Sequence, residues 1–240
     1  MTTTNQDEPK ASSATVAGVL ARLGQIVFVL LLQAAILFLS AGTIRWIWAW
    51  VFLGISVLCI VVNSIFLMRT DARVVAERGR PKETKKWDRV VSGFWSLAQY
   101  LLLPCVAGLD MRFEWTGITG FGWNTFGIIL YSGGLALFSW AMLANAFFST
   151  AARIQSDRGQ IVCRTGPYRY VRHPGYLGVI AQSVGTALLL GSVWALIPAI
   201  AAAALIAVRT NLEDRMLRTE LAGYSEYTEQ VKYRLVPGVW

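Results

Sequence analysis

The chain has 240 residues, of which 55% are hydrophobic and only 15% are charged, and its mean hydropathy is +0.49. This composition leaves too little polar side chain to cover a water-soluble globule, so it excludes an ordinary soluble domain and predicts an all-α integral membrane protein. The net charge of +8 is explained by membrane topology and by attraction to anionic lipid head groups, so nucleic-acid binding is not expected.

Six apolar runs follow one another along the chain, at 24–42, 46–68, 90–109, 123–144, 177–190 and 193–208. Each of the first four is long enough for a transmembrane helix. The last two are shorter and meet at Gly191-Ser192 without a charge between them, which predicts a tight helical hairpin. We therefore expect five to six transmembrane helices, and whether the hairpin crosses the whole bilayer stays open.

The basic residues fix the expected orientation. Six spans place the N-terminus, the basic loop 69–89, the segment 145–176 and the C-terminal tail on one side of the membrane. All but Arg45 and Arg112 of the 22 Lys and Arg residues fall on that side, which the positive-inside rule makes cytoplasmic. We expect a bacterial cytoplasmic membrane protein with both termini inside, although an endoplasmic reticulum location would need the same physics.

Three regions are expected along the chain. Residues 1–20, rich in Thr, Ser and Asn, form a disordered tail, and residues 21–144 hold four transmembrane helices with the basic loop 69–89 between them. Residues 145–240 carry most of the remaining polar chemistry. A cleaved signal peptide is not expected, because the first apolar run is too long and Asp7 and Glu8 precede it.

A metal site of the zinc or iron–sulfur type is not expected. The chain has three cysteines, Cys59, Cys105 and Cys163, without a Cys-x-x-Cys pair, and one histidine, His173. Sites of these types need several His or Cys ligands, which this chain cannot bring together.

The segment "RTGPYRYVRHPGYLG" at 164–178 concentrates residues that break helices and residues that bind ligands. Before it, Asp157-Arg158-Gly159 is a turn signal and Gln160–Cys163 is a short extended run. Pro174 disfavours helix at His173 and suits a first helical turn, so the next helix is expected to begin near Pro174. Its free backbone N–H groups would face whatever binds beside His173.

The segment from 209 onward continues the last apolar run as an amphipathic helix that ends near Gly223. Arg209 and Glu213 are four residues apart and share one helix face. They form either a plain ion pair or two separate contacts to charged parts of a ligand, and the sequence leaves both open.

Together, "GPYRYVRHPGYLG" and the "ED" at 213–214 resemble the Arg-His-Pro-x-Tyr-x-Gly…Glu-Glu signature of the isoprenylcysteine carboxyl methyltransferase family and its phospholipid N-methyltransferase relatives. The resemblance covers roughly residues 60–240 and is strongest from Asn145 onward. It implies a membrane methyltransferase that uses S-adenosylmethionine, held between the membrane and a cytoplasmic cap formed by the C-terminal segment. Asp214 stands where the family usually has a second Glu.

The resemblance also implies roles for individual residues. Arg209 matches the arginine that faces the methyl acceptor, and Glu213 accepts a hydrogen bond from the ammonium or ribose of the cofactor. His173 and Tyr176 are the nearest groups that could take a proton from an amine or thiol acceptor. The cofactor is expected to be surrounded by Gln155, Gln160, Ile161, Val162, Cys163, Tyr168, Arg172, His173, Pro174, Gly175, Tyr176 and Glu213.

The methyl acceptor and the oligomeric state stay open. An isoprenylcysteine-type carboxylate follows from the resemblance, while a phospholipid amine, a small thiol and an isoprenoid or fatty carboxylate are alternatives. A second enzyme class, the NADPH-dependent sterol-type reductases, has a similar Arg-His-Pro segment but typically carries Asn and Glu where this chain has Gly175 and Val179. A third alternative is a non-catalytic lipid-binding membrane protein with the same fold.

Overall fold

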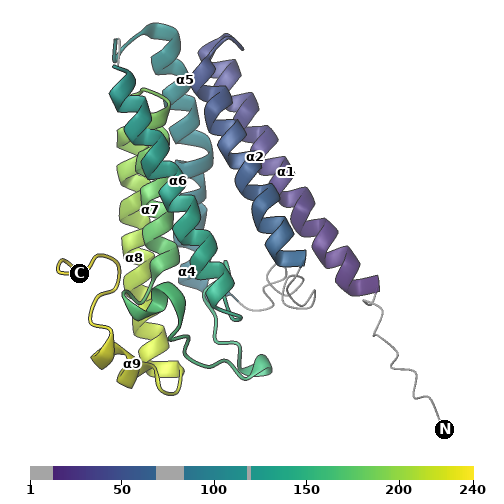
Figure 1. Ribbon diagram of the computed structural model, residues 1–240, viewed down its shortest axis with the longest axis vertical. Coiled ribbons are helices and arrows are strands. Elements are labelled where there is room, and N and C mark those ends of the chain that lie inside the picture. Colours follow the sequence, from purple (N-terminus) through teal and green to yellow (C-terminus); the bar gives the residue numbers. More distant parts are fainter. Residues whose placement is uncertain (1–12, 69–83, 118–119) are drawn as a thin grey trace.

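The computed structural model describes residues 13–68, 84–117 and 120–240, and its elements are helical throughout these ranges. Long helices lie side by side in a bundle, and α9 and the loop between α6 and α7 gather at one end of it (Figure 1). The elements are α1 (Ser13–Ala41), α2 (Ile47–Met68), α4 (Lys86–Leu97), a π-helical turn (Ala98–Leu102), α5 (Leu103–Phe113), α6 (Phe121–Ala144), two 3₁₀ turns (Ser156–Arg158 and Gly166–Arg169), α7 (Pro174–Leu189), α8 (Leu196–Glu220) and α9 (Tyr224–Gln230).

Five helical segments of the described chain are long and apolar enough to cross a membrane: α1, α2, the continuous run Lys86–Phe113, α6 and α8. The predicted all-α membrane fold is therefore confirmed. Helix α7 has only 16 residues, which is about 24 Å of helix and less than the roughly 30 Å hydrocarbon core. It packs against α8 after a short turn, so the predicted C-terminal hairpin is present, with one arm shorter than a full span.

Two predicted boundaries differ from the structure. Helix α1 begins at Ser13, so the disordered tail predicted over 1–20 is too long, and residues 1–12 lie outside the described residues. Most of the predicted basic loop 69–89 also lies outside them, since the description resumes at residue 84. The last residues of that predicted loop are helical instead, because α4 starts at Lys86.

Glycines let α6 and α7 approach each other closely. A Cβ atom added to Gly178 would lie 2.7 Å from the carbonyl oxygen of Gly134, and one added to Gly134 would lie 2.6 Å from the carbonyl oxygen of Gly178. Gly127 of α6 and Gly185 of α7, each seven residues from the glycine just named on its helix, make similarly close contacts to the backbone of the other helix. Small residues at such contacts stabilise helix pairs in membranes through close van der Waals packing. This contact sets the position of α7, which begins at Pro174 directly after His173 and has Tyr176 in its first turn.

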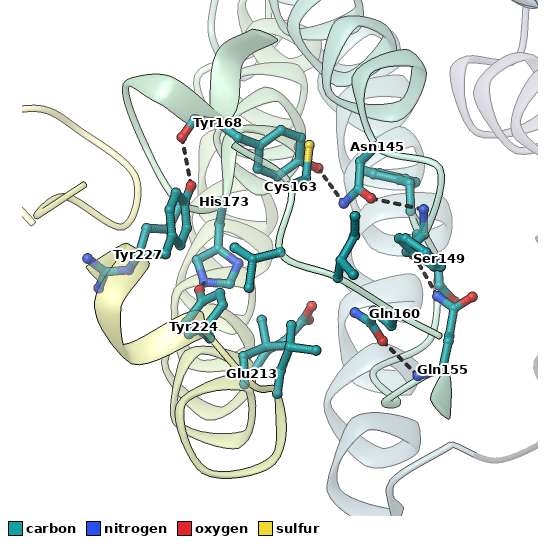
Figure 2. Close-up of a pocket in the computed structure, with 18 of the residues that line it drawn as sticks. Asn145, Ser149, Gln155, Gln160, Cys163, Tyr168, His173, Glu213, Tyr224 and Tyr227 are labelled. Atoms are coloured by element: carbon teal, nitrogen blue, oxygen red, sulfur yellow. Dashed lines mark hydrogen bonds between the residues drawn. The ribbon is translucent and has the colours of Figure 1, made fainter. Parts of the chain in front are cut away.

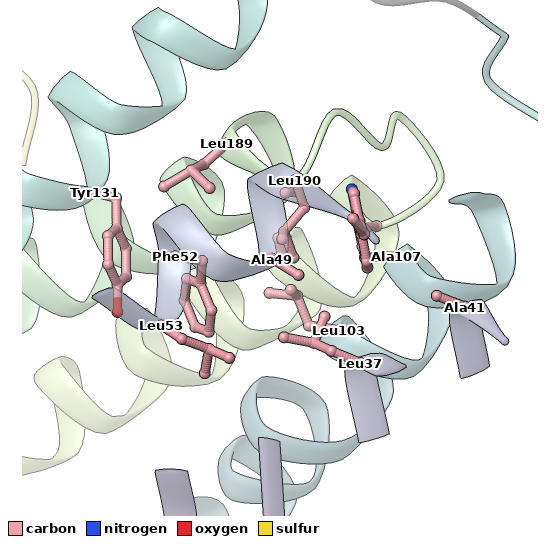
Figure 3. Close-up of a cluster of buried hydrophobic side chains, with 14 residues drawn as sticks. Leu37, Ala41, Ala49, Phe52, Leu53, Leu103, Ala107, Tyr131, Leu189 and Leu190 are labelled. Atoms are coloured by element: carbon pink, nitrogen blue, oxygen red, sulfur yellow. The ribbon is translucent and has the colours of Figure 1, made fainter. Parts of the chain in front are cut away.

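The main apolar cluster lies among α1, α2, α5, α6 and α7, where Leu37, Phe52, Leu103 and Leu189 are buried (Figure 3). A second cluster packs α9 against α8 through side chains that include Leu217, Tyr224 and Tyr227. The second cluster fixes the C-terminal segment at the end of the bundle that carries the loop between α6 and α7.

Candidate active site

A pocket opens at this end of the bundle. It is lined by the loop after α6, the first turn of α7, the last turns of α8, and α9, and it contains about 790 Å³ of empty space, part of it open to solvent. Figure 2 shows His173, Glu213 and Tyr224 on one side of the pocket and Ser149, Gln155 and Gln160 on the other.

The structure brings most of the predicted site residues together. Two of them do not line the pocket: Pro174, which forms the first turn of α7, and Arg209, which lies beneath Tyr176. The predicted residues that do line it are Gln155, Gln160, Ile161, Val162, Cys163, Tyr168, Arg172, His173, Gly175, Tyr176 and Glu213.

The loop after α6 is held in place by its own amides. The Gln155 side chain donates to the carbonyl oxygen of Phe147 (2.6 Å) and accepts from Arg158 (2.6 Å), while its backbone N–H donates to the side-chain oxygen of Gln160 (2.6 Å). The turn predicted at 157–159 is present, with Gly159 at a positive φ of 62°. Gln155 and Gln160 therefore shape the pocket wall.

The short extended run predicted over Gln160–Cys163 does not form a strand. These residues have no regular secondary structure, and no backbone ladder pairs them with another described segment. An extended segment becomes a strand only when a neighbouring strand takes its backbone hydrogen bonds, and the surrounding elements here are helices. The segment instead lines the pocket as an irregular stretch.

The start of α7 is confirmed at Pro174, and the C-terminal segment pairs with the residues before it. The backbone N–H of Arg172 donates to the carbonyl oxygen of Tyr233 (3.0 Å), and that of His173 donates to the carbonyl oxygen of Arg234 (2.9 Å). His173 is thus held at the pocket by the C-terminal segment, and its ring stacks on Tyr176 with the centroids 5.7 Å apart.

Asp214 is the centre of a buried ionic network that the sequence analysis did not predict. Its side chain is 0% exposed, and Arg172 binds it through two nitrogens at 2.8 and 3.2 Å. The remaining groups that bind it are Arg218 (3.2 Å), Arg234 (3.0 Å), the Tyr224 hydroxyl (3.0 Å) and His173 Nε2 (3.3 Å). A buried carboxylate needs such partners, so Asp214 joins α7, α8, α9 and the C-terminal segment into one unit.

Glu213, the neighbour of Asp214, faces the pocket instead. One of its oxygens accepts a short hydrogen bond from the Tyr176 hydroxyl. Its other oxygen has no hydrogen-bond partner among the residues that the structure describes. This oxygen is therefore available to a ligand that donates hydrogen bonds.

Arg209 does not pair with Glu213, so the ion pair considered from sequence is absent in this part of the structure. Its Nε donates to Asp88 of α4 (2.7 Å), one Nη donates to the carbonyl oxygen of Thr150 (2.7 Å), and the guanidinium lies 5.2 Å from the centroid of the Tyr176 ring. Asp88 also accepts from the backbone N–H of Ala152 (2.8 Å). Arg209 thus links α4 and the pocket loop to Tyr176.

Three buried tyrosines outside the membrane-spanning segments stay neutral. Burial raises the pKa of Tyr168, Tyr224 and Tyr227 well above the ordinary value, and the nearby Asp214 charge raises that of Tyr224 further. As neutral phenols, Tyr224 donates to Asp214 (3.0 Å) and Tyr227 donates to the backbone carbonyl oxygen of Tyr168 (2.7 Å). These tyrosines hold α9 against the 3₁₀ turn that carries Tyr168.

A family model for the isoprenylcysteine carboxyl methyltransferase (ICMT) family matches residues 127–219, from the first turns of α6 to the end of α8. Over these residues the chain is similar to the ICMT family. The match includes the whole loop between α6 and α7, the Arg172–Tyr176 segment, Arg209 and Glu213, and it supports the family resemblance drawn from the signature. A comparison with curated proteins finds no match to the chain.

The match to the ICMT family, together with the membrane-spanning helices, supports a membrane methyltransferase. Glu213 and Asp214 have distinct surroundings, because Glu213 opens to the pocket while Asp214 is enclosed by cations. Among the described residues, no group of three or more His, Cys, Asp and Glu side chains is arranged to hold a metal ion.

Proposed function

We propose that the protein is an S-adenosylmethionine-dependent methyltransferase that transfers a methyl group to a lipophilic or small acceptor, with an isoprenylcysteine-type carboxylate as the first choice. The observation that carries the proposal is the pocket in the family-matched region, in which Glu213 presents an unpaired carboxylate oxygen beside His173 and Tyr176. The excess of Lys and Arg on the predicted inner side supports a bacterial cytoplasmic membrane, with the pocket and both termini facing the cytoplasm.

The pocket residues suit the chemistry of this cofactor. Adenosyl cofactors carry aromatic, hydroxyl, ammonium and carboxylate groups, and the lining offers aromatic rings, backbone groups, a carboxylate and guanidinium groups. Glu213 would hold the ammonium or ribose, the irregular stretch Gln160–Cys163 and Tyr168 would flank the nucleoside, and Arg172, His173, Gly175 and Tyr176 would form the wall at the start of α7. Pro174 contributes by starting the helix, since it does not line the pocket.

S-adenosylmethionine, when bound, supplies an electrophilic methyl group on a positively charged sulfur. The chain then has to orient the acceptor and exclude water, and orientation alone can lower a barrier by about 7–11 kcal/mol. A carboxylate acceptor is already ionised at neutral pH and needs no base, whereas an amine or thiol would have to lose a proton, for which His173 is the candidate. The Tyr176 hydroxyl donates to Glu213 and is therefore protonated in this arrangement.

Arg209 is assigned to the acceptor side. The hydroxyl of Tyr176 binds Glu213, while the face of its ring contacts the Arg209 guanidinium, so Tyr176 lies between the two charges. A guanidinium suits recognition of a carboxylate, and Arg209 has donors beyond those used by Asp88 and Thr150.

Transfer of a labelled methyl group tests this proposal. Purified protein is given S-adenosylmethionine with a labelled methyl group together with bacterial membrane lipid extract, and labelled lipid is separated from the cofactor. We expect label in the lipid fraction, and we expect Arg209→Lys, which keeps a cation beside Asp88, to lower turnover about tenfold or more at saturating cofactor, because the planar fork is lost. A fall in cofactor affinity without a fall in turnover would contradict the acceptor assignment.

A further inference from the structure

Arg153 has features of a ligand-binding cation. It lies in the pocket loop and lines the pocket, and its side chain is only 9% exposed. Its single ionic partner in the described chain is Asp157, at 3.1 Å from one Nη, and that carboxylate is 45% exposed. A guanidinium carries five N–H donors, and the described residues use few of those of Arg153. None of its unpaired nitrogens is fully buried, so these donors remain accessible to a ligand.

The other arginines around the pocket are engaged within the protein. Arg172 uses all three side-chain nitrogens, on Asp214 and on the carbonyl oxygens of Val231 and Lys232. Arg158 holds the Gln155 side chain, and Arg209 is bound to Asp88 and does not line the pocket. Among the described arginines that line the pocket, Arg153 is therefore the one whose guanidinium has unused hydrogen-bond donors.

We propose that Arg153 binds the carboxylate of the amino-acid moiety of the cofactor, an inference that rests on the proposed function. The pair of Arg153 with an exposed carboxylate four residues away contributes little, and it leaves most of the guanidinium donors free for a ligand. A ligand carboxylate in the pocket would complete the hydrogen bonding of Arg153, and Glu213 in the same lining presents the opposite charge to an ammonium. The pocket would thus offer Arg153 to the carboxylate and Glu213 to the ammonium of one zwitterionic amino-acid group.

The acceptor could also bring a carboxylate, so the experiment has to separate the two sources. Calorimetric titrations compare S-adenosylhomocysteine with its decarboxylated analogue, which keeps the nucleoside, the thioether and the amine. The proteins are the full-length chain, Arg153→Ala, Arg153→Lys and the matched control Asp157→Asn. The control removes the ion pair but leaves the guanidinium in place.

We expect Arg153→Ala to bind S-adenosylhomocysteine about tenfold or more weakly, as loss of a charge-assisted hydrogen bond implies, while its affinity for the decarboxylated analogue equals that of the wild type. Asp157→Asn should bind S-adenosylhomocysteine at least as tightly as the wild type. Arg153→Lys should lie between the wild type and Arg153→Ala, and it carries the comparison if Arg153→Ala does not fold.

An equal loss of affinity for both ligands would show that Arg153 only supports the loop, and it would overturn the inference. Unchanged affinity for S-adenosylhomocysteine with lowered methyl transfer would overturn it in favour of the acceptor carboxylate. The wild-type titration tests the proposed function separately, because binding of S-adenosylhomocysteine by the wild type stands whether or not Arg153 discriminates between the two ligands.

Discussion

Replacing Asp214 by Asn tests whether the buried ionic network joins the C-terminal segment to the bundle. The substitution keeps the size of the side chain but removes its negative charge, and it leaves Arg172 buried without a counterion. It also replaces one acceptor oxygen with an amide that cannot accept from Arg234 or Arg172 at the same position.

The expected cost follows from the burial of each partner. Breaking a buried ion pair by removing one charge costs about 3–5 kcal/mol, and the Arg172–Asp214 pair belongs to this class because both side chains are at most 2% exposed. Arg218 is 43% exposed, so its pair with Asp214 contributes only about 0–1 kcal/mol. For a chain of this size, 3–5 kcal/mol lowers the Tm by roughly 6–20 °C.

Thermal unfolding of the detergent-purified protein measures this change, with Arg218→Gln as the control that touches only the exposed pair. Limited proteolysis should also cut Asp214→Asn faster near residues 231–240, because Arg172 holds the carbonyl oxygens of Val231 and Lys232. If Asp214→Asn has the same Tm as Arg218→Gln, and its C-terminal segment is protected as in the wild type, the network does not have the role assigned to it.

The remaining predictions concern the helix contact and the pocket. Gly178→Ala should lower stability by about 1–3 kcal/mol, because the new methyl group meets backbone atoms of α6, whereas Gly133→Ala, which meets nothing within 4 Å, should be neutral or stabilising; equal thermal stabilities would contradict the packing account. Glu213→Gln and His173→Ala should each weaken S-adenosylhomocysteine binding in calorimetric titration about tenfold, and unchanged affinity in both would refute the assignment of the cofactor side.

Much of the fold could be predicted because its signals are local. Runs of about 20 apolar residues determine spans without knowledge of the rest of the chain, and Pro174 marks the start of a helix through its own backbone chemistry. The extended run at Gln160–Cys163 does not pair as a strand, because a strand depends on a neighbour that the segment itself does not encode.

The candidate site was predictable where the family signature named its residues, and not where the partners lie far apart in sequence. Asp88 falls within the predicted basic loop 69–89, yet it is buried against Arg209, 121 residues later. Arg172 and Asp214 are 42 residues apart, and nothing in either local pattern indicates that they meet. Arg153 carries no sequence signal beyond its charge, and only its burial beside the pocket makes it notable.

The most direct test of the central claim is a calorimetric titration of S-adenosylhomocysteine into the detergent-purified protein, beside Glu213→Gln. We predict saturable binding in the micromolar range by the wild type, and strongly weakened binding by the variant. An absence of binding, by protein shown to be folded through its thermal transition, would contradict an S-adenosylmethionine-dependent methyltransferase.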